Sequence, residues 1–198
     1  MEQIASESRR LCAGSRQANW LRQGWRFAWM ACVLAAISIA TSRPVRAAEE
    51  YQVKAAFLLN FTKFVGWPEG AFEDEHSPLG ICILGDDPFG STLNEMVKGE
   101  TINGHAVEIR RIRRAPASKE CRVLYIARSE KEAARVLAET GPGILTVGEG
   151  EMFLRYGGII AFVVEDRRVR FDIDQRAAAK AMLTLSSQLM MVARSVQQ

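Results

Sequence analysis

Three short apolar runs, in which polar and apolar positions do not alternate, restrict the fold of this sequence more than any other feature. The clearest is ICIL at 81–84, which Gly85 ends, and residues 123–127 and 144–147 are similar. A strand that is apolar at every position is covered on both faces, as in the middle of a parallel sheet. Residues 106–112 alternate imperfectly and carry more charge, which predicts a more exposed strand at an edge.

Helical patterns separate these runs. Residues 51–65 carry apolar side chains at i, i+3 and i+4 spacings. This pattern predicts a helix with Val53 and Phe57 on its buried face and Lys54 and Lys63 in solvent. Two further helices are predicted, one from the Asp-Asp-Pro turn at 86–88 to about residue 97 and one over 129–139.

The C-terminal region predicts a hairpin followed by a helix. Residues 159–164 and 169–173 are rich in β-formers, and a short charged segment separates them. Asp174 then caps a predicted helix over 175–195, which is rich in Ala, Leu and Met. The apolar positions of this helix are numerous enough for part of it to meet a second subunit, so a homodimer is one expectation.

Together these elements predict one α/β domain of three layers. We expect a mostly parallel, doubly wound sheet between helices, with an antiparallel C-terminal hairpin and a long C-terminal helix. In the common doubly wound order the first and third strands are neighbours. That order would place Cys82 and Cys121 on adjacent strands.

The first 48 residues differ in kind from the rest. Residues 1–26 hold five arginines against two glutamates, residues 27–40 form an uncharged apolar run, and small residues follow at Ala47 and Ala48. This order predicts a signal peptide over 1–48 that is cleaved near Ala47 or Ala48. The mature part would be an exported domain.

An uncleaved membrane anchor is the alternative interpretation of the leader. Only sixteen uncharged residues lie between Arg26 and Arg43, whereas a spanning helix needs about 20 residues. The length of the apolar run therefore favours cleavage.

Removal of the leader changes the charge of the protein. The whole chain has a net charge of +3, but residues 1–48 hold seven of its 26 Lys and Arg and two of its 23 Asp and Glu. The mature domain, residues 49–198, keeps 19 basic and 21 acidic side chains, a net charge of −2. The basic character thus belongs to the leader, and nucleic acid is not an expected partner.

Two cysteines remain in the mature domain, because Cys12 and Cys32 lie in the leader. In an oxidising compartment an even pair predicts a disulfide, here between Cys82 and Cys121. Two separately buried thiols are the alternative, since cysteines in strands are often simply buried.

Groups that could support catalysis are scarce in the mature domain. His76 and His105 lack metal-ligand spacing, and no HExxH, CxxC, GxSxG or phosphate-binding glycine motif is present. The sequence predicts neither an enzyme nor a cofactor or metal site.

Paired acids follow the first strand of the mature domain and form the one candidate site. Such a pair holds Mg²⁺ in response-regulator receivers, but the acceptor Asp expected after the third strand is replaced by Ala127-Arg128. A helix-capping turn is the simpler interpretation. A ligand in an open α/β sheet binds outside the carboxyl ends of the strands. The residues expected there are Asp86, Asp87, Phe89, Arg128 and Ser129.

Four longer blocks carry a resemblance that covers nearly the whole mature domain. They are YQVKAAFLLNFTKFVGWP at 51–68, ICILGDDPFG at 81–90, ECRVLYIARSE at 120–130 and GGIIAFVVEDRRVRFDIDQRAAAKAMLTLSSQLMMVAR at 157–194. In this order the blocks resemble the YfiR-like family of periplasmic proteins.

The resemblance implies an α/β periplasmic domain that engages the periplasmic part of an inner-membrane diguanylate cyclase and represses it, while an outer-membrane lipoprotein relieves the repression. It also implies a family disulfide in the segments that hold Cys82 and Cys121. A second pair found nearer the C-terminus in some relatives has no counterpart, because residues 140–198 contain no cysteine. The alternative function is a periplasmic small-molecule-binding or accessory protein of an envelope sensor or transport system.

Overall fold

The computed structural model describes residues 42–114 and 120–198, with side chains from residue 47 onward. The predicted signal peptide therefore lies almost entirely outside the described residues. Residues 48–198 form one compact unit. No helix in the described part of the chain is long and apolar enough to cross a membrane.

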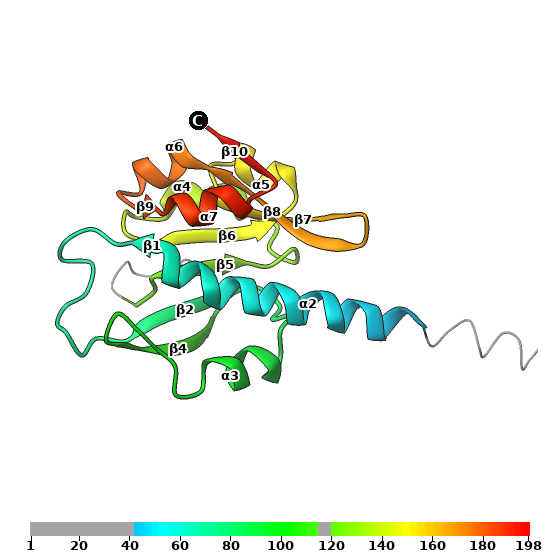
Figure 1. Ribbon diagram of the computed structural model, residues 1–198, viewed down its shortest axis with the longest axis horizontal. Helices are drawn as coiled ribbons and strands as arrows, with labels where there is room; N and C mark the ends of the chain where they lie inside the picture. The colour runs from blue at the N-terminus through cyan, green and yellow to red at the C-terminus, as the bar shows by residue number, and fades with distance from the viewer. Residues whose placement is uncertain (1–41, 115–119) are drawn as a thin grey trace, which may run out of the picture. The chain divides into compact units, whose positions relative to one another are not determined.

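An eight-stranded sheet is the centre of this unit, with strand order β10-β8-β7-β6-β5-β2-β4-β3 (Figure 1). The strands from β4 to β7 are parallel, β8 runs antiparallel to β7, and β10 is parallel to β8. The sheet strands are β2 Leu79–Leu84, β3 Thr101–Ile102, β4 His105–Ile112, β5 Val123–Ile126, β6 Leu145–Glu149, β7 Ile160–Glu165, β8 Arg168–Asp174 and β10 Ser195–Gln197. The predicted mostly parallel sheet, the C-terminal hairpin and the pairing of the first and third predicted strands (β2 with β5) are confirmed.

Helices cover both faces of the sheet. They are α2 Ser42–Phe61, η1 Thr62–Phe64, α3 Ser91–Val97, α4 Ala133–Glu139, α5 Glu151–Arg155, α6 Gln175–Lys180 and α7 Ser187–Val192. Side chains alternate along the central strands: Ile81 and Ile83 of β2 join the core under α2, α3 and α7, whereas Cys82 and Leu84 join the core under α4 and α5. Two apolar cores on opposite faces explain why the central strands are apolar at every position, and they confirm the three layers.

Helix α2 crosses one face of the sheet. Phe57 packs against the core and Lys63 is exposed, as predicted, but the predicted sides of Val53 and Lys54 were wrong. Val53 is 45% exposed, whereas Lys54 is only 1% exposed and Leu58 is fully buried. The helix is therefore rotated so that a lysine faces inward, because that lysine has a buried partner described below. Phe61 stays in the core, where it stacks on Phe162 of β7 at 5.6 Å.

The predicted long C-terminal helix over 175–195 was also wrong. Helix α6 ends at Lys180, and Met182 adopts a left-handed backbone with φ of 57°. Strand β9, Thr184–Leu185, then pairs antiparallel with β1, Val65–Gly66. Helix α7 restarts only where the Ser186 hydroxyl accepts a hydrogen bond from the Leu189 amide.

The last strand is held by an ion pair that local sequence preference does not reveal. The Arg194 guanidinium binds both oxygens of Asp172 in β8, at 2.8 and 2.5 Å. This bidentate contact places β10 beside β8, because residues 195–197 pair with 172–174. Tertiary contacts thus override the helix-forming composition of the segment.

A disulfide joins Cys82 and Cys121, whose Cα atoms are 5.7 Å apart. Both residues are fully buried on the face covered by α4 and α5. Cys82 lies in β2, and Cys121 lies two residues before β5, its neighbour in the sheet. The bond therefore links the middle of β2 to the segment that leads into β5, the neighbouring central strand.

Replacing both cysteines with alanine should lower the free energy of unfolding by about 2–4 kcal/mol, because a loop with a sequence separation of 39 is no longer closed in the unfolded chain. Urea unfolding of the oxidised protein measures this difference. The reduced wild-type protein is the control and should match the double alanine variant. Equal stability of the oxidised wild type and the variant would contradict this role.

Candidate functional site

The residues predicted at the carboxyl ends of the strands do gather there, and most of them shape the turns. Asp86 is exposed, and its backbone N–H donates to Ser129 Oγ at 2.8 Å. Asp87 Oδ1 accepts from the backbone N–H of Phe89 at 2.8 Å, and its Oδ2 accepts from Arg111 Nε at 2.8 Å. The Asp87 carboxylate thus caps a turn and pairs with an arginine of β4, as expected of a capping turn.

Phe89 and Arg128 lead to a second group of side chains at the same edge. The buried Phe89 ring packs edge-on against Tyr125 of β5 and Tyr51 of α2, with centroid distances of 4.7 and 5.9 Å. The Arg128 side chain is 71% exposed and reaches Glu149 with its Nε, 3.1 Å from Oε2. Both residues border a buried carboxylate.

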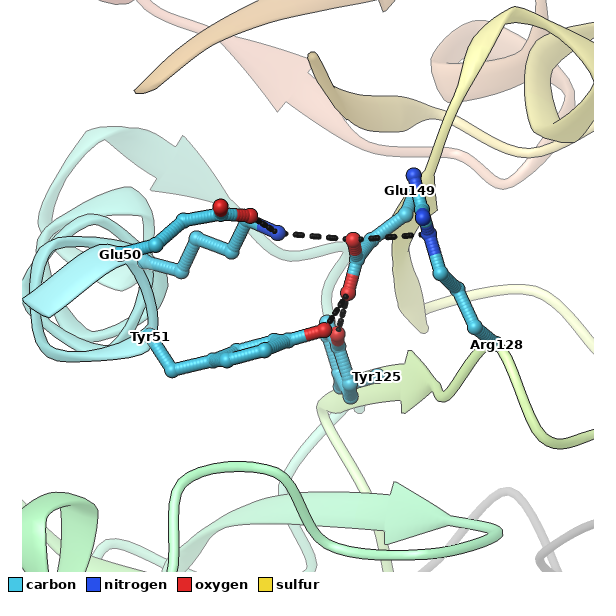
Figure 2. A network of polar contacts seen from close by, with 6 residues as sticks. Glu50, Tyr51, Tyr125, Arg128 and Glu149 are labelled. Atoms are coloured by element: carbon cyan, nitrogen blue, oxygen red, sulfur yellow. Dashed lines mark hydrogen bonds and ion pairs between the residues drawn. The ribbon is translucent and has the colours of Figure 1, made fainter. Parts of the chain in front are cut away.

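That carboxylate, Glu149 at the end of β6, is the centre of a polar network (Figure 2). Its Oε1 accepts hydrogen bonds from the hydroxyls of Tyr125 and Tyr51 at 2.5 and 3.0 Å. Its Oε2 accepts from Lys54 Nζ at 2.7 Å. We call Glu50, Tyr51, Lys54, Tyr125, Arg128 and Glu149 the Glu149 network.

Charges within the Glu149 network balance although its centre is buried. The side chains of Lys54 and Glu149 are 1% and 2% exposed. Lys54 Nζ also contacts Glu50 Oε1 at 2.5 Å, so each buried charge has two partners of opposite sign, counting Arg128. Buried charges are tolerated only when they are paired and hydrogen-bonded in this way.

The surroundings shift the pKa of the acidic groups in opposite directions. Burial alone would raise the pKa of Glu149, but hydrogen bonds from Lys54 and Tyr125 and the charge of Lys54 outweigh it and lower the pKa. Burial and the negative charge of Glu149 raise the pKa of Tyr51 to about 12, and the same causes raise the pKa of Tyr125. The glutamate is therefore ionised and both tyrosines are neutral donors at neutral pH.

This arrangement favours a structural role for the network over a chemical one. Two hydroxyls, an ammonium and a guanidinium occupy the Glu149 oxygens, so the carboxylate has little capacity left to act as a base or ligand. In residues 42–114 and 120–198 no group of three or more His, Cys, Asp or Glu side chains could hold a metal ion.

Sequence reasoning missed five members of the network. They come from α2, β5 and β6, and as many as 98 residues separate the partners: Glu50, Tyr51, Lys54, Tyr125 and Glu149. One signal was present in the sequence. Lys54 precedes Leu58 by four positions, so the two side chains lie on the same face of a helix. A lysine in phase with a buried leucine indicates a buried partner.

Comparison with known protein families supplies a second, independent observation. The family model described as YfiR/HmsC-like matches residues 51–194. The chain belongs to the YfiR/HmsC-like family. This family consists of periplasmic regulatory proteins, not enzymes. A search of curated proteins found no match to the chain.

The YfiR/HmsC-like match covers the whole Glu149 network except Glu50. It also covers both cysteines of the disulfide and the Arg194–Asp172 pair. The region matched to the family is therefore the same region that the buried polar contacts hold together.

Glu149→Gln should lower the free energy of unfolding by about 3 kcal/mol, because it leaves the buried Lys54 with only Glu50 as a counter-charge. Arg128→Gln is the control and should cost less than about 1 kcal/mol, since that side chain is largely exposed. Urea unfolding at neutral pH measures both. A Glu149→Gln variant as stable as Arg128→Gln would contradict the central position of the carboxylate.

Alkaline pH should destabilise the domain through Tyr51. Its pKa is about 12 in the folded protein and about 10 when unfolded, so its contribution is complete below pH 10 and is lost as the pH rises toward 12. Tyr51→Phe should therefore lose less stability than the wild type between about pH 10 and about pH 12. Tyr156→Phe, at a half-exposed position, should behave like the wild type. If the free energy of unfolding falls equally with pH in all three proteins, the loss of stability does not come from Tyr51.

Proposed function

We propose that residues 49–198 form a periplasmic regulatory protein that binds the periplasmic part of an inner-membrane diguanylate cyclase and represses the cyclase. The observation that carries the proposal is the YfiR/HmsC-like match over residues 51–194, which spans nearly all of this domain. A family of periplasmic regulators makes binding, and not catalysis, the expected activity.

A signal peptide cleaved at the predicted point would leave the described domain intact. Ala47 and Ala48 are exposed residues of α2, and residues 48–198 form one compact unit. A signal peptide cleaved near Ala47 or Ala48 would therefore leave the Glu149 network complete, because all its members follow that point. The buried disulfide also suits an oxidising compartment.

Repression requires that the domain bind the inactive state of the cyclase more tightly than the active state. The folded domain supplies a rigid body for this purpose, since the disulfide and the Glu149 network fix its central strands and α2. An outer-membrane lipoprotein that binds the same domain would relieve repression by competing for it, with reciprocal effects on the two affinities.

Self-association through α7, where Met191 is 75% exposed, stays a prediction.

Deletion of the gene should raise cellular cyclic-di-GMP and biofilm formation, because the cyclase loses its repressor. Mass spectrometry of nucleotide extracts measures the first effect. Complementation with the full precursor should restore the low level, whereas a version that starts at Met followed by residues 49–198 should not, since it lacks the predicted signal peptide.

Two outcomes of this experiment would count against the proposal. An unchanged cyclic-di-GMP level in the deletion strain would contradict the proposed regulatory function. Rescue by the leaderless version, with the protein found in the cytoplasm by fractionation, would contradict the proposed periplasmic location. Recovery of an inner-membrane cyclase with the tagged mature domain would support both parts.

A further inference from the structure

A cavity of about 590 Å³ lies at the amino ends of β6 and β7, whereas the Glu149 network lies at the carboxyl end of β6. Its walls come from the end of α4, the start of β6, the end of α5 and helix α6. Ile144 and Thr146 line it near the first residue of β6, whereas Glu149 is the last residue of that strand. The cavity is therefore separate from the Glu149 network, and its volume is typical of a small-molecule site.

Three cations and one carboxylate line this cavity. Arg155 ends α5, and Arg176 and Lys180 lie on α6. Within the described residues none of these three side chains forms an ion pair. Asp174, the one acidic residue in the lining, caps α6 by accepting the Ala177 N–H at 2.9 Å. The lining thus has a formal charge of +2.

The helix dipole explains the positions of only two of these three cations. Arg155 and Lys180 occupy the last turns of α5 and α6, where a cation is favoured by the helix dipole. Arg176 lies in the first turn of α6, where the dipole disfavours a cation. A position that breaks a local rule without a pairing partner is often explained by a ligand, and a bound anion would supply the missing counter-charge.

Most of the remaining lining residues are apolar or glycine, and Thr140 and Thr146 add two hydroxyl groups. Ile144, Leu154 and Ile159 are buried, and the half-exposed Tyr156 adds an aromatic ring. Side chains of this kind can receive the hydrocarbon body of a ligand while polar groups at the wall fix its head.

We propose that this cavity binds a small organic anion with about two negative charges and an apolar body, its anionic head held by Arg155, Arg176 and Lys180. The site is independent of the proposed regulatory function, because it can be tested on the purified mature domain without any membrane partner. A phosphate ester and a dicarboxylate share the required chemistry.

Isothermal titration of the mature domain with phenyl phosphate and with phthalate tests the site and separates the two head groups. At least one should bind with a Kd below about 1 mM, whereas benzyl alcohol, which has no charge, should bind at least tenfold more weakly. The double variant Arg176→Gln with Lys180→Gln should weaken binding of the anion at least tenfold, and added salt should weaken binding to the wild type.

The matched control removes two exposed arginines from another part of the surface, Arg113→Gln with Arg114→Gln. It changes the net charge by the same amount and should alter the Kd less than twofold. All four substituted side chains are exposed, so both variants should keep the wild-type thermal midpoint. No binding of either anion up to about 10 mM, or equal weakening by both double variants, would overturn the proposal.

Discussion

The buried carboxylate of Glu149 is the contact on which the arrangement of the domain depends. Removing a carboxylate and a lysine from water costs several kcal/mol for each ion, and that cost is offset only where all partners are in place. Tyr51 and Lys54 of α2, Tyr125 of β5 and Arg128 after β5 supply those partners. Because the donors come from three segments, the network can form only when α2 lies across the carboxyl ends of β5 and β6. The apolar packing of Leu58 and Phe61 then has a single position on the sheet.

The disulfide restrains the same strands from the other face. Cys82 and Cys121 lie in the core under α4 and α5, while Tyr125, four residues after Cys121, points to the core under α2. One short segment therefore carries a covalent link on one face and a buried hydrogen bond on the other. Both links lie within residues 49–198, so neither involves a residue of the segment 1–48.

The sheet could be predicted from the sequence because local patterns determine it. Strands such as 81–84 are apolar throughout, and they are separated by helices, so a parallel order with β2 beside β5 follows from general rules. Two other features depend on partners far away in the sequence. The inward orientation of Lys54 depends on Glu149, and the break of the C-terminal helix depends on the pairing of β9 with β1 and on the Arg194–Asp172 contact. Periodicity and propensity describe a segment alone, so they placed Lys54 in solvent and continued the helix.

The two ends of the parallel strands also differ because of contacts between residues that are distant in the sequence. Ligands in open α/β sheets usually bind outside the carboxyl ends of the strands, where the candidate residues were expected. Here Phe89 packs against two tyrosines at that edge and Glu149 is fully engaged, so the usual position is filled by the protein itself. At the opposite edge, the antiparallel return of β8 brings α6 beside the first residues of β6 and β7. That return leaves a cavity lined by Arg155, Arg176 and Lys180, three cations to which no acidic side chain of the described residues is paired. Side chains of α2, β5 and β6 therefore fill the carboxyl end of the sheet, whereas the return of β8 leaves a cavity at the other end.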